Sequence, residues 1–171
     1  MENSEKTEIY TDGACSPNPG AGGYGLIIVQ NSRRTELSGG FRNTTNNRME
    51  MMAALVGLQM VAKDVDVDVV VYSDSRYLVN MVNGGYARKW RANGWRLANR
   101  QPALNSDLWG ELLDLAHDRV TFEWVRGHNE HPENEQCDAM AVAARLESDL
   151  PPDFGYEQSR AAVVSEQLSL F

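Results

Sequence analysis

The chain has 171 residues, a length that suits a single domain with a sizeable hydrophobic core. Its formal net charge of -8 argues against nucleic-acid binding, but residues 75–106 contain six arginines and lysines and no acid. No segment reaches the ~20 apolar residues of a membrane span. The two cysteines lack a zinc-binding spacing and are too few for a disulfide framework, which favours a reducing compartment such as the cytoplasm. We also expect the chain to be a monomer.

The first predicted elements are strands. Residues 8–11 are β-branched and aromatic, and this strand ends at Asp12, which is followed by a glycine and a proline-rich loop. Residues 24–30 and 33–41 are predicted as the second and third strands. Because their connection is short, these strands must be antiparallel neighbours, so we expect the three strands to form a meander.

A helix over residues 48–62 follows capping residues at 44–47, and it carries Glu50 in its first turn. Residues 65–72 are predicted as a fourth strand, which is reached through this helix and can therefore run parallel to the first. Asp74 follows that strand at its carboxyl end, where open α/β sheets bind ligands. Acids near helix N-termini also stabilise the helix dipole or cap the helix, so a purely structural role stays open for both acids.

The second half of the chain alternates between predicted helices and one strand. Helices are expected over 76–82, 86–93, 107–117 and 134–146, the last with Asp138 in its first turns, and a fifth strand over 120–125. Trp109 and Trp124 lie within regular elements and are expected in the core. Tyr86, Trp90 and Trp95 are interleaved with basic residues, a pattern that suits nucleic-acid binding unless they too are core residues.

The composition changes at residue 148, where two prolines and scattered acids predict a flexible linker. The predicted organisation is therefore an N-terminal tail over 1–6, one domain over 7–147 and a C-terminal tail over 148–171.

Four acids stand at strand ends or helix starts: Asp12, Glu50, Asp74 and Asp138. Brought together without cations, they would repel one another and take up protons. A divalent cation removes this repulsion, and an all-oxygen site suits Mg²⁺ or Mn²⁺ rather than zinc. Two such ions can support the attack of water at phosphorus, so we expect phosphodiester hydrolysis. His128 lies in a polar loop and could move protons there, although a lone histidine is more often a surface residue.

Five motifs together resemble bacterial-type ribonuclease HI. They are TDG at 11–13, TTNNRME at 44–50, SDS at 73–75, WVRGH at 124–128 and HPENEQCD at 131–138. The resemblance implies an α/β ribonuclease H-like fold, with a five-stranded mixed sheet in the order 3-2-1-4-5 and helices on both faces. It implies an endonuclease that cuts the RNA strand of RNA–DNA hybrids, such as primers and R-loops, and leaves 5′-phosphate and 3′-hydroxyl ends.

The resemblance also implies residue roles. Asp12, Glu50, Asp74 and Asp138 would be catalytic acids that hold two Mg²⁺ ions, replaceable by Mn²⁺, with His128 assisting. Residues 84–102 match the family's basic handle, and Arg76 stands where the family often has glutamine. The implied contacts with the hybrid are Gly13, Cys15, Asn18, Thr45, Asn46, Asn47, Arg76, Trp90 and Asn105.

The last five residues resemble peptides that dock into the bacterial sliding clamp; they are Gln167, Leu168, Ser169, Leu170 and Phe171. Packing of this end on the domain is the alternative. Two other functions stay open: a DNA-processing nuclease of the same fold, resolvase- or transposase-like, and a hybrid-binding module without activity. The basic handle and the Asn46-Asn47 pair favour the hybrid, and the presence of all four acids favours an enzyme.

Overall fold

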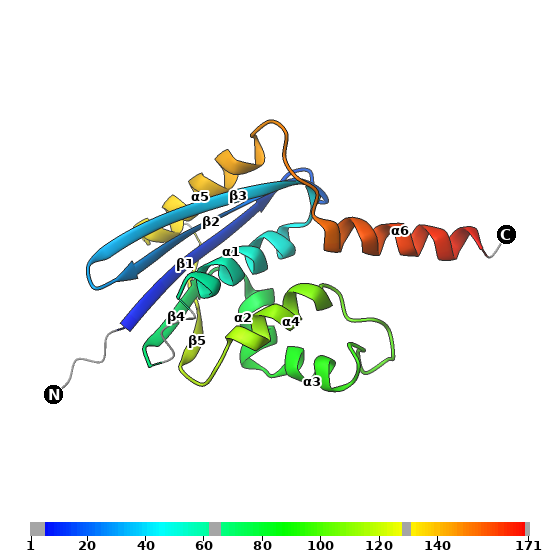
Figure 1. The fold of residues 1–171 in the computed structure, drawn as a ribbon, viewed down its shortest axis with the longest axis horizontal. Coiled ribbons are helices and arrows are strands. Elements are labelled where there is room, and N and C mark those ends of the chain that lie inside the picture. The colour runs from blue at the N-terminus through cyan, green and yellow to red at the C-terminus, as the bar shows by residue number, and fades with distance from the viewer. Residues whose placement is uncertain (1–5, 62–65, 128–130, 170–171) are drawn as a thin grey trace.

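The computed structural model describes residues 6–61, 66–127 and 131–169. Within them the strands form one sheet in the order β3-β2-β1-β4-β5. The first three strands are antiparallel, and β4 pairs in parallel with both β1 and β5. This confirms the predicted mixed sheet and its order (Figure 1). The strands are β1 Lys6–Cys15, β2 Gly20–Gln30, β3 Arg33–Thr44, β4 Asp68–Ser73 and β5 Val120–Trp124.

Helices cover both faces of the sheet (Figure 1). They are α1 Asn46–Val61, α2 Arg76–Asn83, α3 Tyr86–Ala92, α4 Ser106–Leu115, α5 Pro132–Arg145 and α6 Phe154–Leu168. α5 packs on β1, β2 and β3, while α1 packs on the opposite face and contacts α4. The core lies between α1, α4 and the sheet, where Ile9, Leu58, Val71 and Trp109 are fully or almost fully buried.

The C-terminal region differs from the predicted linker, because residues 154–168 form α6. Asp153 caps this helix by accepting a hydrogen bond from the Tyr156 amide, and its carboxylate is buried beneath Arg48 and Thr44. The linker prediction is therefore wrong for this stretch. The composition of this stretch is polar, but Asp153 is buried and accepts hydrogen bonds from residues more than a hundred positions earlier in the chain.

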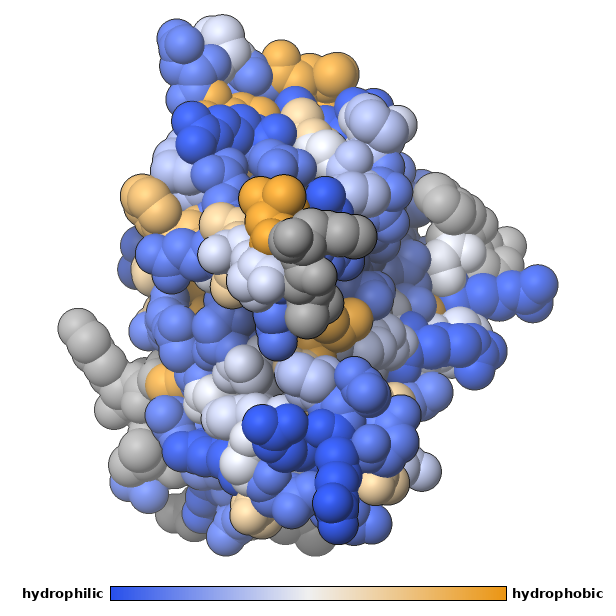
Figure 2. All heavy atoms as spheres, turned by 90° about the vertical axis from the view of Figure 1, so that its right-hand side faces the viewer, coloured by the Kyte–Doolittle hydropathy of each residue, from blue (hydrophilic) through white to orange (hydrophobic). Residues whose placement is uncertain are grey.

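Beyond its first turns α6 projects away from the rest of the molecule (Figure 1), and none of its residues is buried. The face from which it projects is mainly hydrophilic (Figure 2). Among the described residues, no helix combines the length and apolar character that a membrane crossing requires.

Candidate active site

Three of the four predicted acids come together at one end of the sheet. The carboxylate oxygens of Asp12, Glu50 and Asp74 lie within 4.8 Å of one another. Asp12 belongs to β1, and Asp74 directly follows β4, its parallel neighbour. Thr11 pairs with Ser73 in the parallel register of β1 and β4. The residues that follow them, Asp12 and Asp74, therefore lie side by side. Glu50 is contributed by the first turns of α1, which packs on β1.

A glycine permits the close approach of α1 to β1. A Cβ atom at Gly13 would lie 2.5 Å from the backbone nitrogen of Glu50 and 2.7 Å from the carbonyl carbon of Met49. Both neighbours are main-chain atoms, so a side chain at position 13 would push the helix away from the strand. The Gly13 amide also donates a 2.8 Å hydrogen bond to Asp12 Oδ1. The separation of Asp12 and Glu50 therefore depends on this glycine.

The cluster is buried and electrostatically costly. Burial, together with the negative charges of Asp74 and Asp138, raises the pKa of Asp12 to about 8. Burial also raises the pKa of Glu50 well above its ordinary value, with Asp12 and Asp74 adding to the effect. Glu50 Oε2 is buried and has no hydrogen-bond partner among the described residues. A divalent cation would satisfy this oxygen and remove the repulsion, so these residues fit a metal site.

The other two predicted site residues are placed differently. Asp138 is half-buried on α5 and lies outside the group of three, but its charge acts on Asp12. His128 lies outside the described residues.

Several predicted hybrid contacts gather around the N-terminal end of α1. Asn18 Oδ1 accepts a 3.2 Å hydrogen bond from the Asn46 amide, and Thr45 Oγ1 accepts one of 3.2 Å from the Arg48 amide. Asn47 is exposed beside them. Gly13 and Cys15 stand at the end of the adjoining strand β1, which pairs with β2.

Asn105 and Trp90 belong to a second group, which is linked to α1 through Arg48. Asn105 Oδ1 accepts a 3.4 Å hydrogen bond from Arg48, and its amide nitrogen lies 3.3 Å from the Tyr77 hydroxyl. The Tyr77 hydroxyl also accepts from Trp109, whose ring meets that of Trp90 edge to face at 6.3 Å. This arrangement joins Asn105 and Trp90 into one packed group beside α1.

The predicted basic handle, residues 84–102, contains α3 and the loop after it. Its five basic residues are all exposed: Arg88, Lys89, Arg91, Arg96 and Arg100. Trp90 and Trp95 are half-buried against the core, whereas Tyr86 is 49% exposed. The charged side chains, rather than the tryptophans, form the outer surface of the handle.

The prediction that Trp124 belongs to the core is wrong, since its side chain is 39% exposed. It ends β5, an edge strand, and alternation along the sequence does not reveal which end of such a strand meets solvent. The Arg76 guanidinium carbon lies over the Trp124 ring, 4.1 Å from the ring centroid.

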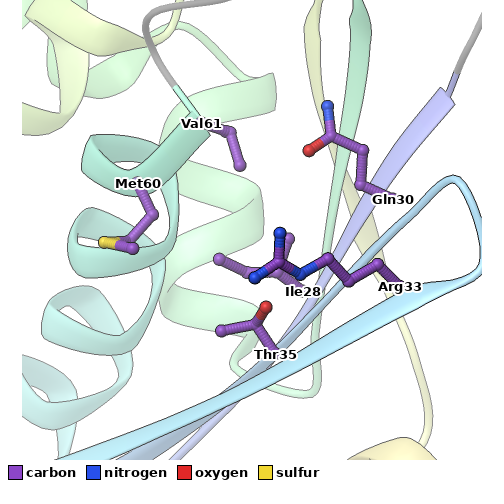
Figure 3. Close-up of a pocket in the computed structure, with 6 residues that line it drawn as sticks. All are labelled: Ile28, Gln30, Arg33, Thr35, Met60 and Val61. Carbon is purple, nitrogen blue, oxygen red and sulfur yellow. The ribbon is translucent and has the colours of Figure 1, made fainter.

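A separate pocket of about 270 Å³ lies away from this cluster (Figure 3). It is lined by residues of β2, β3 and the last turn of α1, including Arg33, Met60 and Val61. Glu50 lies at the opposite end of α1, so the pocket is not part of the acid site.

We expect Gly127→Ala to reduce the rate of the predicted phosphodiester hydrolysis by about a hundredfold, because small misplacements of catalytic groups have effects of this size. A Cβ atom at Gly127 would lie 2.5 Å from Asp74 Oδ2 and would displace that carboxylate. The matched control is Gly110→Ala in α4, where the nearest atom is 3.7 Å away. Steady-state cleavage and thermal melting check both variants. Full activity of Gly127→Ala would contradict the tight fit around Asp74.

The fold and site together define a class of protein. A sheet of order 3-2-1-4-5, with a carboxylate cluster where two central parallel strands end, is the ribonuclease H fold with its acidic centre. The RNase H family model matches residues 4–145. This chain belongs to the RNase H family, whose members are endoribonucleases that cleave the RNA strand of RNA–DNA hybrids.

Comparisons with curated relatives and solved structures agree with this family assignment. The chain is 54% identical over 157 residues to Ribonuclease H of Rippkaea orientalis, covering 91% of this chain and 95% of that one. It is 49% identical over 138 residues to Ribonuclease HI of a Synechocystis strain, covering 80% and 85%. The crystal structure of LC9-RNase H1, described as a type 1 RNase H with the type 2 active-site motif, superposes with a TM-score of 0.72. Its identity is 25%, over 85% of this chain and 74% of that one.

Proposed function

We propose that this chain hydrolyses the RNA strand of RNA–DNA hybrids at the cluster formed by Asp12, Glu50 and Asp74, leaving 5′-phosphate and 3′-hydroxyl ends. The convergence of these three carboxylates within 4.8 Å is the observation that carries the proposal. The buried and unpartnered oxygen of Glu50 supports it, because a buried acid of this kind destabilises the fold unless a cation binds. Asp138 and His128 are proposed to assist.

The metal we propose is Mg²⁺, as two ions in the working complex, with Mn²⁺ able to substitute. The donors are all carboxylate oxygens, which suit these hard cations. Asp12, Glu50, Asp74 and Asp138 would hold the ions. When bound, Mg²⁺ supplies an activated water and stabilises the charge on the leaving oxygen.

The residues around α1 are proposed to bind the two strands of the hybrid. Small polar groups suit the 2′-hydroxyls of a minor groove, and Asn18, Asn46 and Asn47 lie together near the acids. The backbone at Gly13 and Cys15 would add contacts to the same strand. A phosphate of the DNA strand would bind to Thr45, Trp90 and Asn105. The exposed arginine and lysine side chains of the handle, residues 84–102, would neutralise further phosphates.

Cleavage of three labelled duplexes tests this function: RNA–DNA hybrid, duplex DNA and duplex RNA, each with Mg²⁺ and with EDTA. We expect cleavage of the hybrid alone, in the RNA strand and only with the metal. Equal cleavage of duplex DNA would favour a resolvase- or transposase-like nuclease instead. Binding of the hybrid without cleavage would favour a non-catalytic module.

The C-terminal peptide, residues 167–171, is proposed to dock into the bacterial sliding clamp, which would bring the enzyme to RNA primers and R-loops in the cytoplasm. The support is its place beyond the anchored part of α6, where Leu168 is 71% exposed. Leu170 and Phe171 lie outside the described residues. We propose that the enzyme acts there as a monomer.

We expect deletion of residues 167–171 to abolish capture by an immobilised sliding clamp and to leave hybrid cleavage unchanged. None of the residues of α6 is buried, so losing its end removes no core contact. A variant in which residues 167–171 are changed to alanine or serine keeps the full chain length and should lose capture as the deletion does. Undiminished capture of the deleted chain would contradict this role.

A further inference from the structure

The side-chain amide of Asn105 is held at both ends by residues of two helices. Arg48 of α1 donates a 3.4 Å hydrogen bond to Asn105 Oδ1, and Asn105 Nδ2 donates one of 3.3 Å to the Tyr77 hydroxyl of α2. An arginine can only donate hydrogen bonds, so the amide oxygen must face Arg48 and the NH₂ group must face Tyr77. One N–H of the amide is thereby committed to Tyr77, which leaves the second N–H to bind another acceptor.

The stability of α4 does not account for this arrangement. Asn105 immediately precedes α4, where an asparagine side chain normally accepts a hydrogen bond from a backbone amide of the first turn, yet this side chain caps no amide. Its backbone has a φ of 59°, in the left-handed region that residues other than glycine seldom adopt. The side chain of Asn105 is therefore directed to Arg48 and Tyr77 at the expense of a helix cap.

The two groups that hold Asn105 are themselves fixed. The Arg48 side chain is almost fully buried and forms ion pairs with Asp107 and Asp153. The Tyr77 hydroxyl also accepts a 3.2 Å hydrogen bond from the indole Nε1 of Trp109, and the two rings pack with their centroids 5.6 Å apart. The Asn105 amide consequently cannot rotate without losing a hydrogen bond to a rigid neighbour.

Thr45 is oriented with the same polarity. Its Oγ1 accepts a 3.2 Å hydrogen bond from the backbone amide of Arg48, so the hydroxyl hydrogen points elsewhere. By itself this bond is an ordinary helix cap. Together with Asn105, however, it means that two uncharged groups have their oxygens occupied by Arg48 and present hydrogens. Phosphate oxygens, which only accept hydrogen bonds at neutral pH, require such donors.

We propose that Tyr77 and Arg48 are positioning residues, which turn the donor hydrogens of Asn105 and Thr45 toward a phosphate of the DNA strand. This inference rests on the proposed function, in which that phosphate binds to Thr45 and Asn105. Without the Tyr77 hydroxyl, the Asn105 amide keeps only its bond to Arg48 and is free to rotate. A donor fixed before binding loses less conformational entropy when the phosphate arrives, so the affinity for the hybrid is higher.

The first test measures the binding of a labelled hybrid in EDTA over a series of salt concentrations. We expect Tyr77→Phe, which removes only the hydroxyl, to weaken binding about fivefold, the usual effect of one hydrogen bond. The slope of log affinity against log salt should stay the same, because no charge is lost. Tyr72→Phe is the matched control. It removes a hydroxyl that also forms two hydrogen bonds, with Lys6 and Glu8, and should leave binding unchanged.

A double-mutant cycle shows whether Tyr77 acts through Asn105. Asn105→Gly removes the amide and suits the left-handed backbone at this position, so it should weaken binding without adding strain. In that background, Tyr77→Phe should have no further effect on the affinity for the hybrid. A purely structural role of Tyr77 would weaken binding in both backgrounds.

Modified hybrids locate the phosphate. Each carries one methylphosphonate in the DNA strand, in which a methyl group replaces a charged oxygen. We expect the wild-type chain to lose affinity most strongly at one position of this modification. Tyr77→Phe and Asn105→Gly should both lose much less affinity at that same position, because the contact is already weakened. Equal sensitivity of Tyr77→Phe and wild type at every position would contradict the proposal.

Loss of stability needs a control of its own. Tyr77→Phe also removes the acceptor of the buried Trp109 N–H and should lower the melting temperature. Val69→Ala removes buried volume near the start of β4, far from Asn105 in the fold, and should lower the melting temperature as well. We expect its affinity for the hybrid to equal that of wild type at temperatures where both chains are folded.

Two results would overturn the inference: unchanged hybrid affinity of Tyr77→Phe, or a further loss of affinity from Tyr77→Phe in the Asn105→Gly background. Both leave the proposed function intact if the wild-type chain still cleaves hybrids. Failure of the wild-type chain to cleave them would instead refute the proposed function itself.

Discussion

We expect Asp12→Asn to reduce hybrid cleavage by at least about a thousandfold and at the same time to raise the melting temperature of the metal-free protein. The activity is lost because the neutral amide is a poor ligand for a hard cation, whose contribution to catalysis is several kcal/mol. Stability rises because Asp12 is 5% exposed and lies with Glu50 and Asp74 in a cluster of like charges. Removing one charge relieves both burial and repulsion.

The same argument gives a pH dependence for the metal-free chain. The pKa of Asp12 is raised from 3.8 to about 8, so between these values the folded state holds a proton that the unfolded state has released. The free energy of unfolding therefore falls as pH rises through this range. In EDTA the wild-type protein should melt lower at pH 8 than at pH 6, and Asp12→Asn should show a flatter profile.

The measurements are single-turnover cleavage with Mg²⁺ and thermal melting in EDTA. At pH 8 we expect a gain of roughly 4–8 °C, which corresponds to about 2 kcal/mol for a chain of this size. Glu36→Gln is the control, since Glu36 is an exposed acid paired with Arg34 on the β2–β3 hairpin. Cleavage equal to wild type would refute the assigned site. A lower melting temperature would show that the acids are already neutralised without metal.

Asp153→Asn is expected to destabilise the folded chain by about 3–5 kcal/mol, the usual effect of breaking a buried ion pair. Its carboxylate accepts hydrogen bonds of 2.7 and 2.8 Å from Arg48 and one of 2.7 Å from Thr44. Both charged side chains are almost fully buried. The amide leaves the Arg48 guanidinium with Asp107 as its remaining ion-pair partner, and the Asp107 side chain is 43% exposed.

Urea unfolding measures this effect, and two controls separate it from loss of α6. Glu157→Gln removes the exposed pair with Arg42 and should change stability little. A chain ending at residue 158 keeps Asp153 and should be as stable as the full chain, whereas one ending at residue 150 should lose as much as Asp153→Asn. Equal stability of the two truncated chains would contradict the anchoring role.

Local patterns were sufficient to predict most of the fold. Short connections allow only antiparallel neighbours, and a strand reached through a helix can run parallel to the first; β1 to β4 follow these rules. The same reasoning placed Asp12 and Asp74 at the ends of two strands that can run parallel, while the resemblance to a family implied that these strands are neighbours. For Glu50 the sequence pattern alone left a simple helix-stabilising role open, and only its resemblance to a family pointed to the site.

The errors of prediction share one cause. The composition after residue 148 is that of a linker, yet Asp153 is anchored by Arg48, 105 positions away. Trp124 lies in a regular strand, yet it is exposed because β5 is at the edge of the sheet. Neither contact nor exposure is encoded in the residues next to these positions.

The amino-acid sequence by itself determined the kinds of element, their order along the chain and the residues able to hold a cation, because periodicity, turns and side-chain chemistry are local properties. Only the tertiary structure decided how near Glu50 comes to Asp12, where Arg76 rests and what covers Asp153. Those distances result from the packing of α1 against β1 around Gly13 and from contacts between segments far apart in the chain.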